Sequence, residues 1–535
     1  MFTKKSEGSV PESRADDVSQ AEVAALNKLG YNQELKRGFN LIGIIGFSFA
    51  IVTSWSALGG VLIIGVTSGG PPVIVWSWIA ICVLTLAVAY SLAEMCSAYP
   101  VAGGQYAWVA LFAPKSMRRT MSYVCGWFLL IGILAMGATS HFVTANFILG
   151  LATLNNPSFV IERWHTVLVG WAIAASTLVF NVFFTRLLNA TSQGFLILNL
   201  SSFVIVVVTI LAMNNNKSSA SFVFSDFVNL TGFSDSYAAI LGLLQAAFGM
   251  CCYDSASRMT EEIKDARKQA PRAIVLSVYI GFVTGFVFLV AACFCIGDVE
   301  AVATGPTGVP LIEIFRYSTG EAGASGLAAL IVVVGYGASY GLTATGGRAV
   351  YAFARDHGLP FSAFFSKVRT SNATPVNGLC LTVAVQWALL AIYFGAVQGF
   401  NTVIAIATEG FYVSYALPLL ARLLSLMTSE PVRSIGGEYH LGKWSIPLNA
   451  IGLVYLLFTV ITFNFPGLSP VTADNMNYTS AAVGVIMFIA LITWFTTGRR
   501  HFRGPQSGGV VLDGEKSEIG VKNGVGAGVN EDHDK

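Results

Sequence analysis

Residues 240–272 read ILGLLQAAFGMCCYDSASRMTEEIKDARKQAPR, and the other helices make most sense as a wall around the first half of this stretch. It is apolar up to Phe248, and a run of charges begins at Arg258. Between them, Asp254 lies about one turn inside the expected lipid boundary, where a carboxylate facing lipid costs roughly 2.5 to 3.5 kcal/mol. Asp254 is therefore expected to face protein or water. Because irregular backbone at membrane depth is tolerated only away from lipid, the stretch predicts a broken membrane helix that lines a cavity.

The composition indicates a membrane protein. Of 535 residues, 54% are hydrophobic and 11% are charged, and the mean hydropathy is +0.65. Water-soluble domains have about 25% charged residues, so the chain is predicted to be an all-α polytopic membrane protein. The net charge of +2 comes without a basic domain, which argues against a nucleic-acid partner. The eight cysteines show no CxxC pair and no histidine at metal spacing, so we expect small buried hydrophobes, no disulfide frame, no metal and no cofactor.

Twelve apolar stretches are long enough to cross about 30 Å of hydrocarbon. They lie at about 40–66, 73–95, 121–152, 164–185, 190–213, 237–257, 273–297, 323–354, 375–395, 400–425, 446–465 and 479–498. The predicted domain is 39–500, with helices 1–5 at about 40–213, helices 6–10 at about 237–425 and helices 11–12 at about 446–498. Residues 1–38 form a polar N-terminal tail without a signal peptide, and residues 501–535 are expected to be disordered.

Basic residues predict the orientation. If both termini are cytosolic, only Arg163, Lys217 and Arg316 of the 31 Lys and Arg residues fall on outer segments. The outer loops then contain glycosylation acceptor patterns at Asn216, Asn229 and Asn477. Similar patterns at Asn189 and Asn372 fall on the predicted inside, so the pattern alone does not decide the orientation.

The first helix contains an interruption like that of the sixth. Residues 53–60 read TSWSALGG, and these small and hydroxylated residues allow the backbone to leave helical geometry. The alternative is that they simply pack helices together. Two interruptions five helices apart favour an inverted repeat of five plus five helices, with broken helices 1 and 6 and a binding site between the repeats.

Residues 91–114, SLAEMCSAYPVAGGQYAWVALFAP, predict a structured loop, because Pro100 and a glycine pair prevent one continuous helix. Glu94 in this loop is expected to have a structural role, paired with Arg118 or Arg119 or placed at the membrane interface. Arg348 and Arg355 with Asp356 are expected to form a salt-bridge network at the inner end of helix eight. The basic residues between Lys264 and Arg272 are explained by topology and anionic lipid.

Together, several motifs resemble fungal permeases of the amino acid/choline transporter family, within the amino acid, polyamine and organocation superfamily. They are LGYNQELKRGF, SGGPP after the first helix, the 91–114 loop, YDSASRMTEEIKDARKQAPRAI and RAVYAFARDHGLPFS. The resemblance runs from about Leu29 to Arg500. It identifies the family specifically but says little about which substrate is transported. It implies a leucine-transporter-like fold, alternating access, and movement of amino acids, gamma-aminobutyrate, choline or polyamines, usually with protons.

The resemblance also implies a substrate site on helices one and six. Its candidate residues are Ser54, Trp55, Ser56, Ala57, Phe248, Gly249, Cys251 and Tyr253. Amides and hydroxyls of 54–57 would hold a carboxylate at the positive end of a half helix. The carbonyls of Phe248 and Cys251 would hold an amino group, under an aromatic gate formed by Phe248. Two features depart from the family: Cys252 replaces a common glycine, and helix five has no lysine.

Proton coupling would need a titrating group inside the membrane. Asp254 is the first candidate, followed by His141 and Glu409, with Glu94 also considered. A lone histidine in a helix is more often hydrogen-bonded to a neighbour, and Glu409 is as well explained by an outer gate or by solvation. An aromatic cage for a cation is also conceivable, and its candidates are Trp55, Phe248, Tyr253, Tyr336, Tyr340, Phe411 and Tyr412.

The sequence therefore favours a secondary active transporter for amino acids or gamma-aminobutyrate with protons. The alternatives are transport of choline, a polyamine or another amine, including export in a secondary-metabolite pathway, and a non-transporting nutrient receptor. An enzyme is disfavoured because phosphate loops and nucleophile elbows are absent. The plasma membrane is the expected location, with a vacuolar or other internal membrane as the alternative. Tail lysines Lys4, Lys5, Lys516 and Lys522 are accessible candidates for a ubiquitin ligase.

Overall fold

The computed structural model is an all-α bundle, as predicted. It describes residues 26–27, 31, 33–52, 54–184, 187–369, 373–428, 435–473, 475–502 and 504. Within these ranges, 11 helices are long and apolar enough to cross a membrane, which agrees with a multi-pass membrane protein. The lysines considered for ubiquitin modification, and the sequon at Asn372, lie outside the described residues.

The main helices follow the predicted apolar stretches closely. They are α2 (Leu41–Val52), α3 (Ser54–Thr67), α4 (Gly70–Ala98), α6 (Arg118–Asn155), α7 (Arg163–Phe183), α8 (Leu188–Met213), α10 (Asp235–Gly249), α12 (Ala266–Phe294), α14 (Pro310–Arg355), α16 (Val376–Gly395), α17 (Val397–Ser425), α18 (Ser445–Thr462) and α19 (Thr479–Thr493). Short elements join them: α5 (Gln105–Phe112), α9 (Ala220–Phe224), α11 (Ser255–Arg258), α13 (Val299–Ala303), α15 (Ser362–Phe365) and α20 (Arg499–His501). Two-residue strands β1 (Ser68–Gly69) and β2 (Val228–Asn229) pair antiparallel.

Two elements differ in length from the predicted spans. α14 has 46 residues because it merges two helices across Gly320, whose φ of 74° is not helical. α10 has 15 residues and ends at Gly249, eight residues before the predicted end of the sixth span. At 1.5 Å per residue, α10 reaches only about 22 Å, less than the hydrocarbon thickness of about 30 Å. It is therefore not among the 11 helices that are long enough to cross alone.

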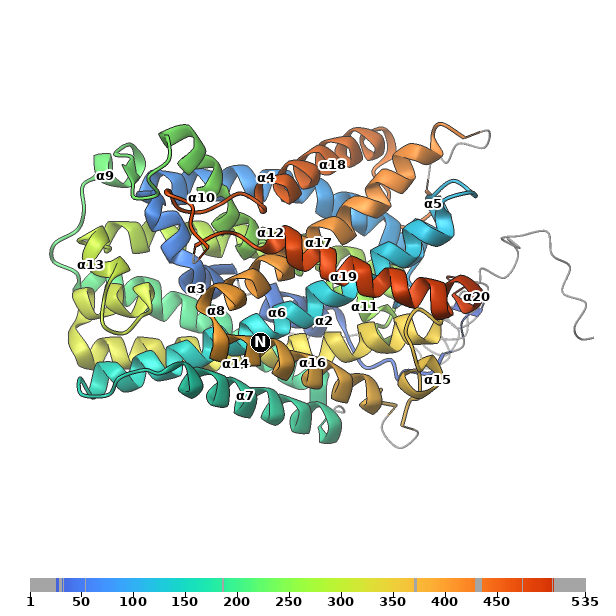
Figure 1. Ribbon diagram of the computed structural model, residues 1–535, viewed down its shortest axis with the longest axis horizontal. Helices are drawn as coiled ribbons and strands as arrows, with labels where there is room; N and C mark the ends of the chain where they lie inside the picture. The colour runs from blue at the N-terminus through green and yellow to red at the C-terminus, as the bar shows by residue number, and fades with distance from the viewer. Residues whose placement is uncertain are drawn as a thin grey trace, which may run out of the picture.

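The long helix α6 lies in the middle of the bundle, where it packs against α14 and α17 (Figure 1). In the same bundle, α12 packs against α4 and α2, and α10 packs against α3 and α4. The buried side chains of these helices form one large apolar cluster. This packing places α2, α3, α6, α14 and the end of α10 around one interior space.

The backbone after α10 is irregular. Residues 250–254 are not helical, and the chain becomes helical again in the four residues of α11. Cys252 has a φ of 65°, in the left-handed region that favours glycine. Cys252, where the resemblance implied a glycine, is therefore the residue with this conformation.

The run at 53–60 differs from the prediction for the first helix. Residues 54–60 are helical and belong to α3, whereas the sequence predicted irregular backbone there. Thr53 separates α2 from α3 and lies outside the described residues. The small residues of this run serve close packing instead: a Cβ added at Gly59 would approach Leu311 to 2.4 Å.

Replacing Cys252 by glycine is expected to stabilise the protein relative to Cys252→Ala by about 1 kcal/mol, because a left-handed conformation costs non-glycine residues about that much. Both variants remove the thiol, so their difference isolates the backbone effect. Thermal unfolding of the two purified variants measures it. Equal melting temperatures would show that the backbone at residue 252 is not strained.

Candidate substrate-binding site

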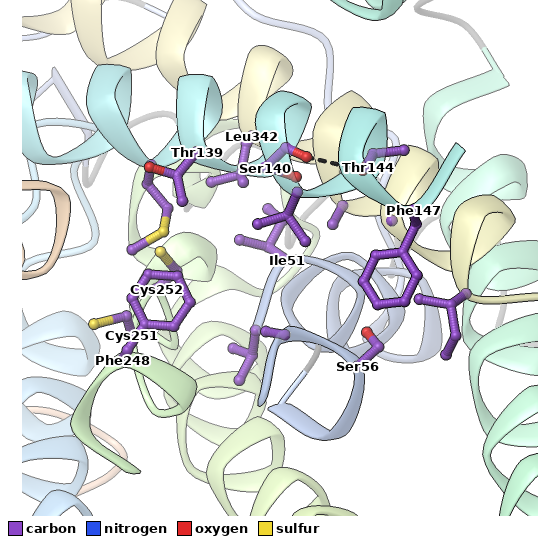
Figure 2. A pocket seen from close by; sticks show the side chains of 17 residues that line it. Ile51, Ser56, Thr139, Ser140, Thr144, Phe147, Phe248, Cys251, Cys252 and Leu342 are labelled. Carbon is purple, nitrogen blue, oxygen red and sulfur yellow. Dashed lines mark hydrogen bonds between the residues drawn. The ribbon is translucent and has the colours of Figure 1, made fainter. Parts of the chain in front are cut away.

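A cavity lies between α2, α3, α6, α14 and the irregular residues after α10 (Figure 2). Its empty volume is about 630 Å³, including the part open to solvent. The lining residues are Ile51, Val52, Ser56, Ala57, Met136, Thr139, Ser140, Val143, Thr144, Phe147, Phe248, Cys251, Cys252, Ile331, Gly335, Ala338 and Leu342.

The lining is apolar with a few uncharged polar groups. Hydroxyls come from Ser56 on α3 and from Thr139, Ser140 and Thr144 on α6. The Ser140 Oγ lies 2.9 Å from the Oγ of Ser339 on α14, and the Thr144 hydroxyl donates to the Ser140 carbonyl at 2.8 Å. None of the lining residues is Asp, Glu, Lys, Arg or His. The cavity therefore offers hydrogen bonds and main-chain dipoles but no formal charge from a side chain.

Four predicted substrate-site residues line this cavity. Ser56 and Ala57 contribute from the first turn of α3. Phe248 contributes from the end of α10, and Cys251 from the irregular residues after it. Figure 2 shows Ser56 near Phe147 on one side and Phe248 with the two cysteines on the other. The arrangement therefore brings the two predicted half-sites together around one space. The side chain of Ser54 lies outside the described set.

The other three predicted residues are not among the lining residues. Trp55 is fully buried; its Nε1 donates to Asn199 Oδ1 at 2.6 Å, and its ring packs edge-on against Phe288. A Cβ added at Gly249 would meet α3 and α4 side chains rather than the cavity. Tyr253 packs against the ring of Tyr415 at 5.0 Å. Consecutive helical residues point about 100° apart, so a four-residue motif on one helix cannot all face one cavity.

The hypothetical aromatic cage does not form around this cavity. Of its seven candidates, only Phe248 lines it. The Tyr412 hydroxyl donates to the Ala247 carbonyl at 3.0 Å, and the Tyr336 hydroxyl donates to Ser176 at 3.0 Å. The Cζ atom of Arg258 lies 5.4 Å from the centroid of the Phe411 ring, so this ring packs against the guanidinium group. Phe147 of α6 supplies the cavity with a second ring that the sequence did not single out.

The residues missed by sequence reasoning come from α6 and α14. Thr139, Ser140, Val143, Thr144 and Phe147 follow helical spacing along one face of α6. Hydroxylated residues at positions i, i+1 and i+5 in an apolar helix were the available signal. The signal is weak because the same residues are common in helix packing.

Asp254 is fully buried and does not line the cavity. Its Oδ2 lies 2.6 Å from Nη1 of Arg258, and its Oδ1 accepts from Nη2 at 3.0 Å. Gln105 Nε2 and the Tyr415 hydroxyl also donate to it, each at 2.5 Å. The carboxylate thus has a buried cationic partner one helical turn away, in keeping with the expectation that it faces protein instead of lipid.

The other two coupling candidates lie in different surroundings. His141 is buried, and its Nε2 lies 3.1 Å from Oε1 of Gln386, so the expected hydrogen-bonded histidine is confirmed. Glu409 is 4% exposed, and its Oε1 accepts from Asn464 at 3.3 Å. Its Oε2 has no hydrogen-bond partner among the described residues. Neither side chain lines the cavity.

The predicted partners of Glu94 were wrong. Glu94 pairs with Arg422 of α17, and Nη1 of Arg422 lies 2.6 Å from Oε2 of Glu94. The Glu94 carboxylate also accepts hydrogen bonds from the Ser445 hydroxyl and from the Leu441 amide. Arg119 instead donates to main-chain carbonyls near residues 498–502. The structural role expected for Glu94 is therefore confirmed with a different partner. Arg422 is 328 residues away in sequence, so no local pattern indicates it.

Arg348 and Arg355 form ion pairs at the end of α14, as expected, but their acidic partners are not Asp356. Arg348 pairs with Glu262, and Arg355 donates to Glu261 at 2.9 and 3.0 Å. Asp356 accepts instead from the hydroxyls of Tyr31 and Tyr106. Burial raises the pKa of the Asp356 carboxyl, against the opposing charge of Arg355.

A strap formed by residues 33–39 covers this end of the bundle. The amides of Gly38 and Phe39 donate to the Glu262 carbonyl, and Glu34 accepts from the Tyr351 hydroxyl at 2.7 Å. Phe39 also forms a parallel bridge with Ile263. We refer to this end as the strap end.

The cysteines are free thiols. No group of three metal-ligating side chains occurs in the described part of the chain. Seven of the eight are buried, but Cys380 on α16 is exposed. The expectation that all are buried is therefore wrong for Cys380, which lies on the outer face of the bundle, where an apolar side chain also fits in lipid.

Comparison with known proteins identifies relatives over most of the chain. The amino acid permease family matches residues 40–490. A Macrophomina phaseolina protein named as an amino acid/polyamine transporter is 60% identical over 440 residues, which cover 82% of this chain and 97% of that protein. The choline transporter of Saccharomyces cerevisiae is 31% identical over 91% of this chain and 85% of its own length. Amino-acid permease 2 of Neurospora crassa is 28% identical over 90% of this chain and 88% of its own length. The chain therefore belongs to the amino acid permease family of membrane transporters.

Proposed function

We propose that the cavity binds one zwitterionic amino acid or gamma-aminobutyrate, and that the protein moves it across the membrane with protons by alternating access. The observation that carries this proposal is a cavity without charged side chains, bounded by the start of α3 and the end of α10. A ligand whose own charges cancel enters such a cavity at the lowest electrostatic cost.

The two ends of the cavity match the two ends of a zwitterion. Main-chain amides at the start of a helix carry partial positive charge, and carbonyls at its end carry partial negative charge. We place the substrate carboxylate near Ser56 and Ala57, and the ammonium group near the carbonyls of Phe248 and Cys251. Ser140 and Thr144 of α6 also line the cavity. Their hydroxyls offer hydrogen bonds to polar atoms that lie between the carboxylate and the ammonium group of the substrate.

Choline is the second candidate, supported by Phe248 and Phe147 in the cavity and by the named yeast relative. Two rings without a carboxylate make a weaker site for a quaternary ammonium than an aromatic box. A polyamine carries two or more positive charges, and the cavity offers no carboxylate to balance them. We therefore rank the zwitterion first, choline second and polyamines third.

The proposed architecture is the inverted five-plus-five repeat over 39–500. In it, α2 with α3 is the first helix, and α10 with residues 250–258 is the sixth, giving twelve spans in all. The contact between α3 and α10 supports this assignment. The strap end faces the cytosol, so both tails are inside, and the protein is assigned to the plasma membrane as an importer.

Radiolabelled uptake in cells that lack related permeases tests the function. Saturable uptake of an amino acid or gamma-aminobutyrate, competed by zwitterions more strongly than by choline or spermidine, is expected. A proton uncoupler is expected to abolish accumulation. Stronger competition by choline would favour the second candidate, and uptake of none of these compounds would favour a receptor or an exporter.

Glu409→Gln is expected to reduce proton-driven accumulation at least tenfold, while exchange of labelled for unlabelled substrate continues. Asp254 already has a compensating cation. The buried carboxylate of Glu409 has one oxygen without a partner among the residues that the structure describes, so binding a proton removes a buried charge that no described cation balances. Uptake with and without a pH gradient, in cells with equal surface protein, measures the effect. Accumulation at the normal level in this variant would exclude Glu409 as the coupling group.

Asn216→Gln is expected to abolish a glycosidase-sensitive shift in gel mobility. The Asn216 side chain is exposed, whereas Nδ2 of Asn229 donates to Phe233 and Asp235, and Nδ2 of Asn477 donates to two carbonyls. A glycan requires an accessible amide nitrogen, so Asn229→Gln and Asn477→Gln serve as controls that keep the shift. A shift that persists in Asn216→Gln would contradict this assignment.

A further inference from the structure

One face of α17 contacts the irregular backbone after α10 at two points. The Tyr412 hydroxyl donates to the Ala247 carbonyl at 3.0 Å, and the Tyr415 hydroxyl donates to Oδ1 of Asp254 at 2.5 Å. Residues three apart lie on the same side of a helix, so both hydroxyls reach this segment from one face of α17. The two contacts lie on either side of the cysteine pair in the chain.

The contact of Tyr412 lies next to the carbonyls that are proposed to bind the substrate ammonium group. Ala247 directly precedes Phe248 in the last turn of α10. Carbonyls in the last turn of a helix lack their regular intrahelical donors, so other groups decide how this turn is held. The Met250 amide donates to the Ala247 carbonyl at 3.3 Å, and the Tyr412 hydroxyl donates to the same oxygen. Tyr412 therefore helps to set the position of the carbonyl end of α10.

The end of α18 supports Tyr412 from the other side. The Tyr412 hydroxyl lies 2.7 Å from the Tyr455 hydroxyl, and the Tyr412 ring packs against the ring of Phe463 with centroids 5.6 Å apart. Tyr412 is 1% exposed. Because both its ring and its hydroxyl are in contact with α18 or the residue after it, a movement of this end of α18 is transmitted to Tyr412.

Glu409 contacts the same end of α18. Asn464 follows Phe463 in the chain, and its Nδ2 donates to Oε1 of Glu409 at 3.3 Å. Within the described part of the chain, no charged or titratable side chain interacts with Glu409, from α17 itself or from the helices packed against it. A protonated carboxyl gains a donor and loses acceptor capacity, so the bond to Asn464 is the contact that protonation of Glu409 alters.

We propose that Tyr412 is a positioning residue that links proton binding at Glu409 to the substrate-binding carbonyls at the end of α10. The link runs from Glu409 to Asn464 and the adjoining Phe463. It continues from Phe463 to Tyr412 and from the Tyr412 hydroxyl to the Ala247 carbonyl. The proposal rests on the proton coupling and the ammonium position proposed above, and it adds the contact through which one affects the other. Symport requires that the proton and the substrate strengthen the binding of each other.

The pH dependence of substrate affinity tests this link, with tritiated L-alanine and tritiated gamma-aminobutyrate binding to the purified full-length protein. The wild type is expected to bind at least one of them with a Kd about tenfold lower in acidic than in neutral medium, a common size for coupling between two sites. Tyr412→Phe keeps the ring and removes the bond to Ala247, so its Kd is expected to differ less than about twofold between the two media. A purely structural role would raise Kd by the same factor in both media and leave the pH dependence intact.

Tyr123→Phe is the matched control. Tyr123 is 2% exposed, its hydroxyl lies 2.8 Å from the Thr493 hydroxyl, and it does not line the substrate cavity. This variant loses an equally buried hydroxyl and is expected to keep the pH dependence of the wild type. A Tyr412→Phe protein whose Kd changes with pH as in the wild type would overturn the role of Tyr412. A wild-type Kd that does not change with pH would overturn the proton coupling proposed above, and the link with it.

Hydrogen exchange provides the test if Tyr412→Phe does not fold. Glutamine has the neutral side chain that a proton gives to glutamate, so Glu409→Gln is compared with the wild type in the same mildly alkaline medium. Main-chain amides of residues 246–254 are expected to change their exchange rates at least about threefold, whereas those of α12 keep theirs. Equal rates at 246–254 in the two proteins would show that Glu409 does not act on the end of α10.

Discussion

Asp254→Asn is expected to lower the free energy of unfolding by about 3 to 5 kcal/mol, because it leaves the Arg258 guanidinium buried without a carboxylate. Arg258 is 1% exposed, and the rings and aliphatic side chains around it cannot replace the lost charge. Removing one partner of a buried pair costs more than the pair itself contributes, since the remaining charge keeps its desolvation penalty. Thermal unfolding of the purified variant in detergent measures the loss.

Two further variants separate this cause from a general effect of substitution. Adding Arg258→Gln to Asp254→Asn removes the orphaned charge and is expected to recover most of the lost stability. Asp265→Asn is the exposed control: Asp265 and Lys268 are partly exposed and 4.0 Å apart, and such pairs contribute at most about 1 kcal/mol. A single variant as stable as the wild type, or a double variant less stable than Asp254→Asn, would contradict the argument.

The class of the fold could be predicted from the sequence because it depends on quantities that add along the chain. Apolar length sets the number of spans, and the charge at Asp254 forces the side chain away from lipid. The interruption after α10 was also predictable, although the sixth span was predicted to end later, because Gly249 and the cysteine pair after it interrupt a clear apolar pattern. The pairing of Glu94 with Arg422 was not predictable, because it depends on which helices become neighbours.

The site was only half predictable for a related reason. A motif indicates which segments approach the ligand, but the rotation of each helix decides which side chains face it. Ser56 and Ala57 line the cavity, whereas Trp55 turns about 100° away and bonds to Asn199. The residues contributed by α6 and α14 have the composition of ordinary packing helices. Their role follows only from the position of the helices around the cavity.

Ala57→Phe is expected to reduce uptake and substrate affinity at least 100-fold, equivalent to about 2.7 kcal/mol at 1.36 kcal/mol per tenfold. Ala57 lies in the first turn of α3 and lines the cavity between its two proposed charge-binding ends. A phenyl ring at this position occupies the space of the ligand and covers the amides that would bind its carboxylate. Initial uptake rates and binding of a radiolabelled substrate to the purified variant measure the two losses.

The same substitution at Ala80 is the matched control, because Ala80 of α4 is exposed and does not line the substrate cavity. Ala57→Phe is expected to keep a melting temperature close to that of the wild type, because the cavity already holds empty space for the ring. Folded protein at the cell surface without uptake would therefore place the defect in the cavity. Uptake at the wild-type rate in Ala57→Phe would mean that the substrate does not pass between α3 and the end of α10. The proposed match between helix ends and a zwitterion would then be wrong, whatever the substrate proves to be.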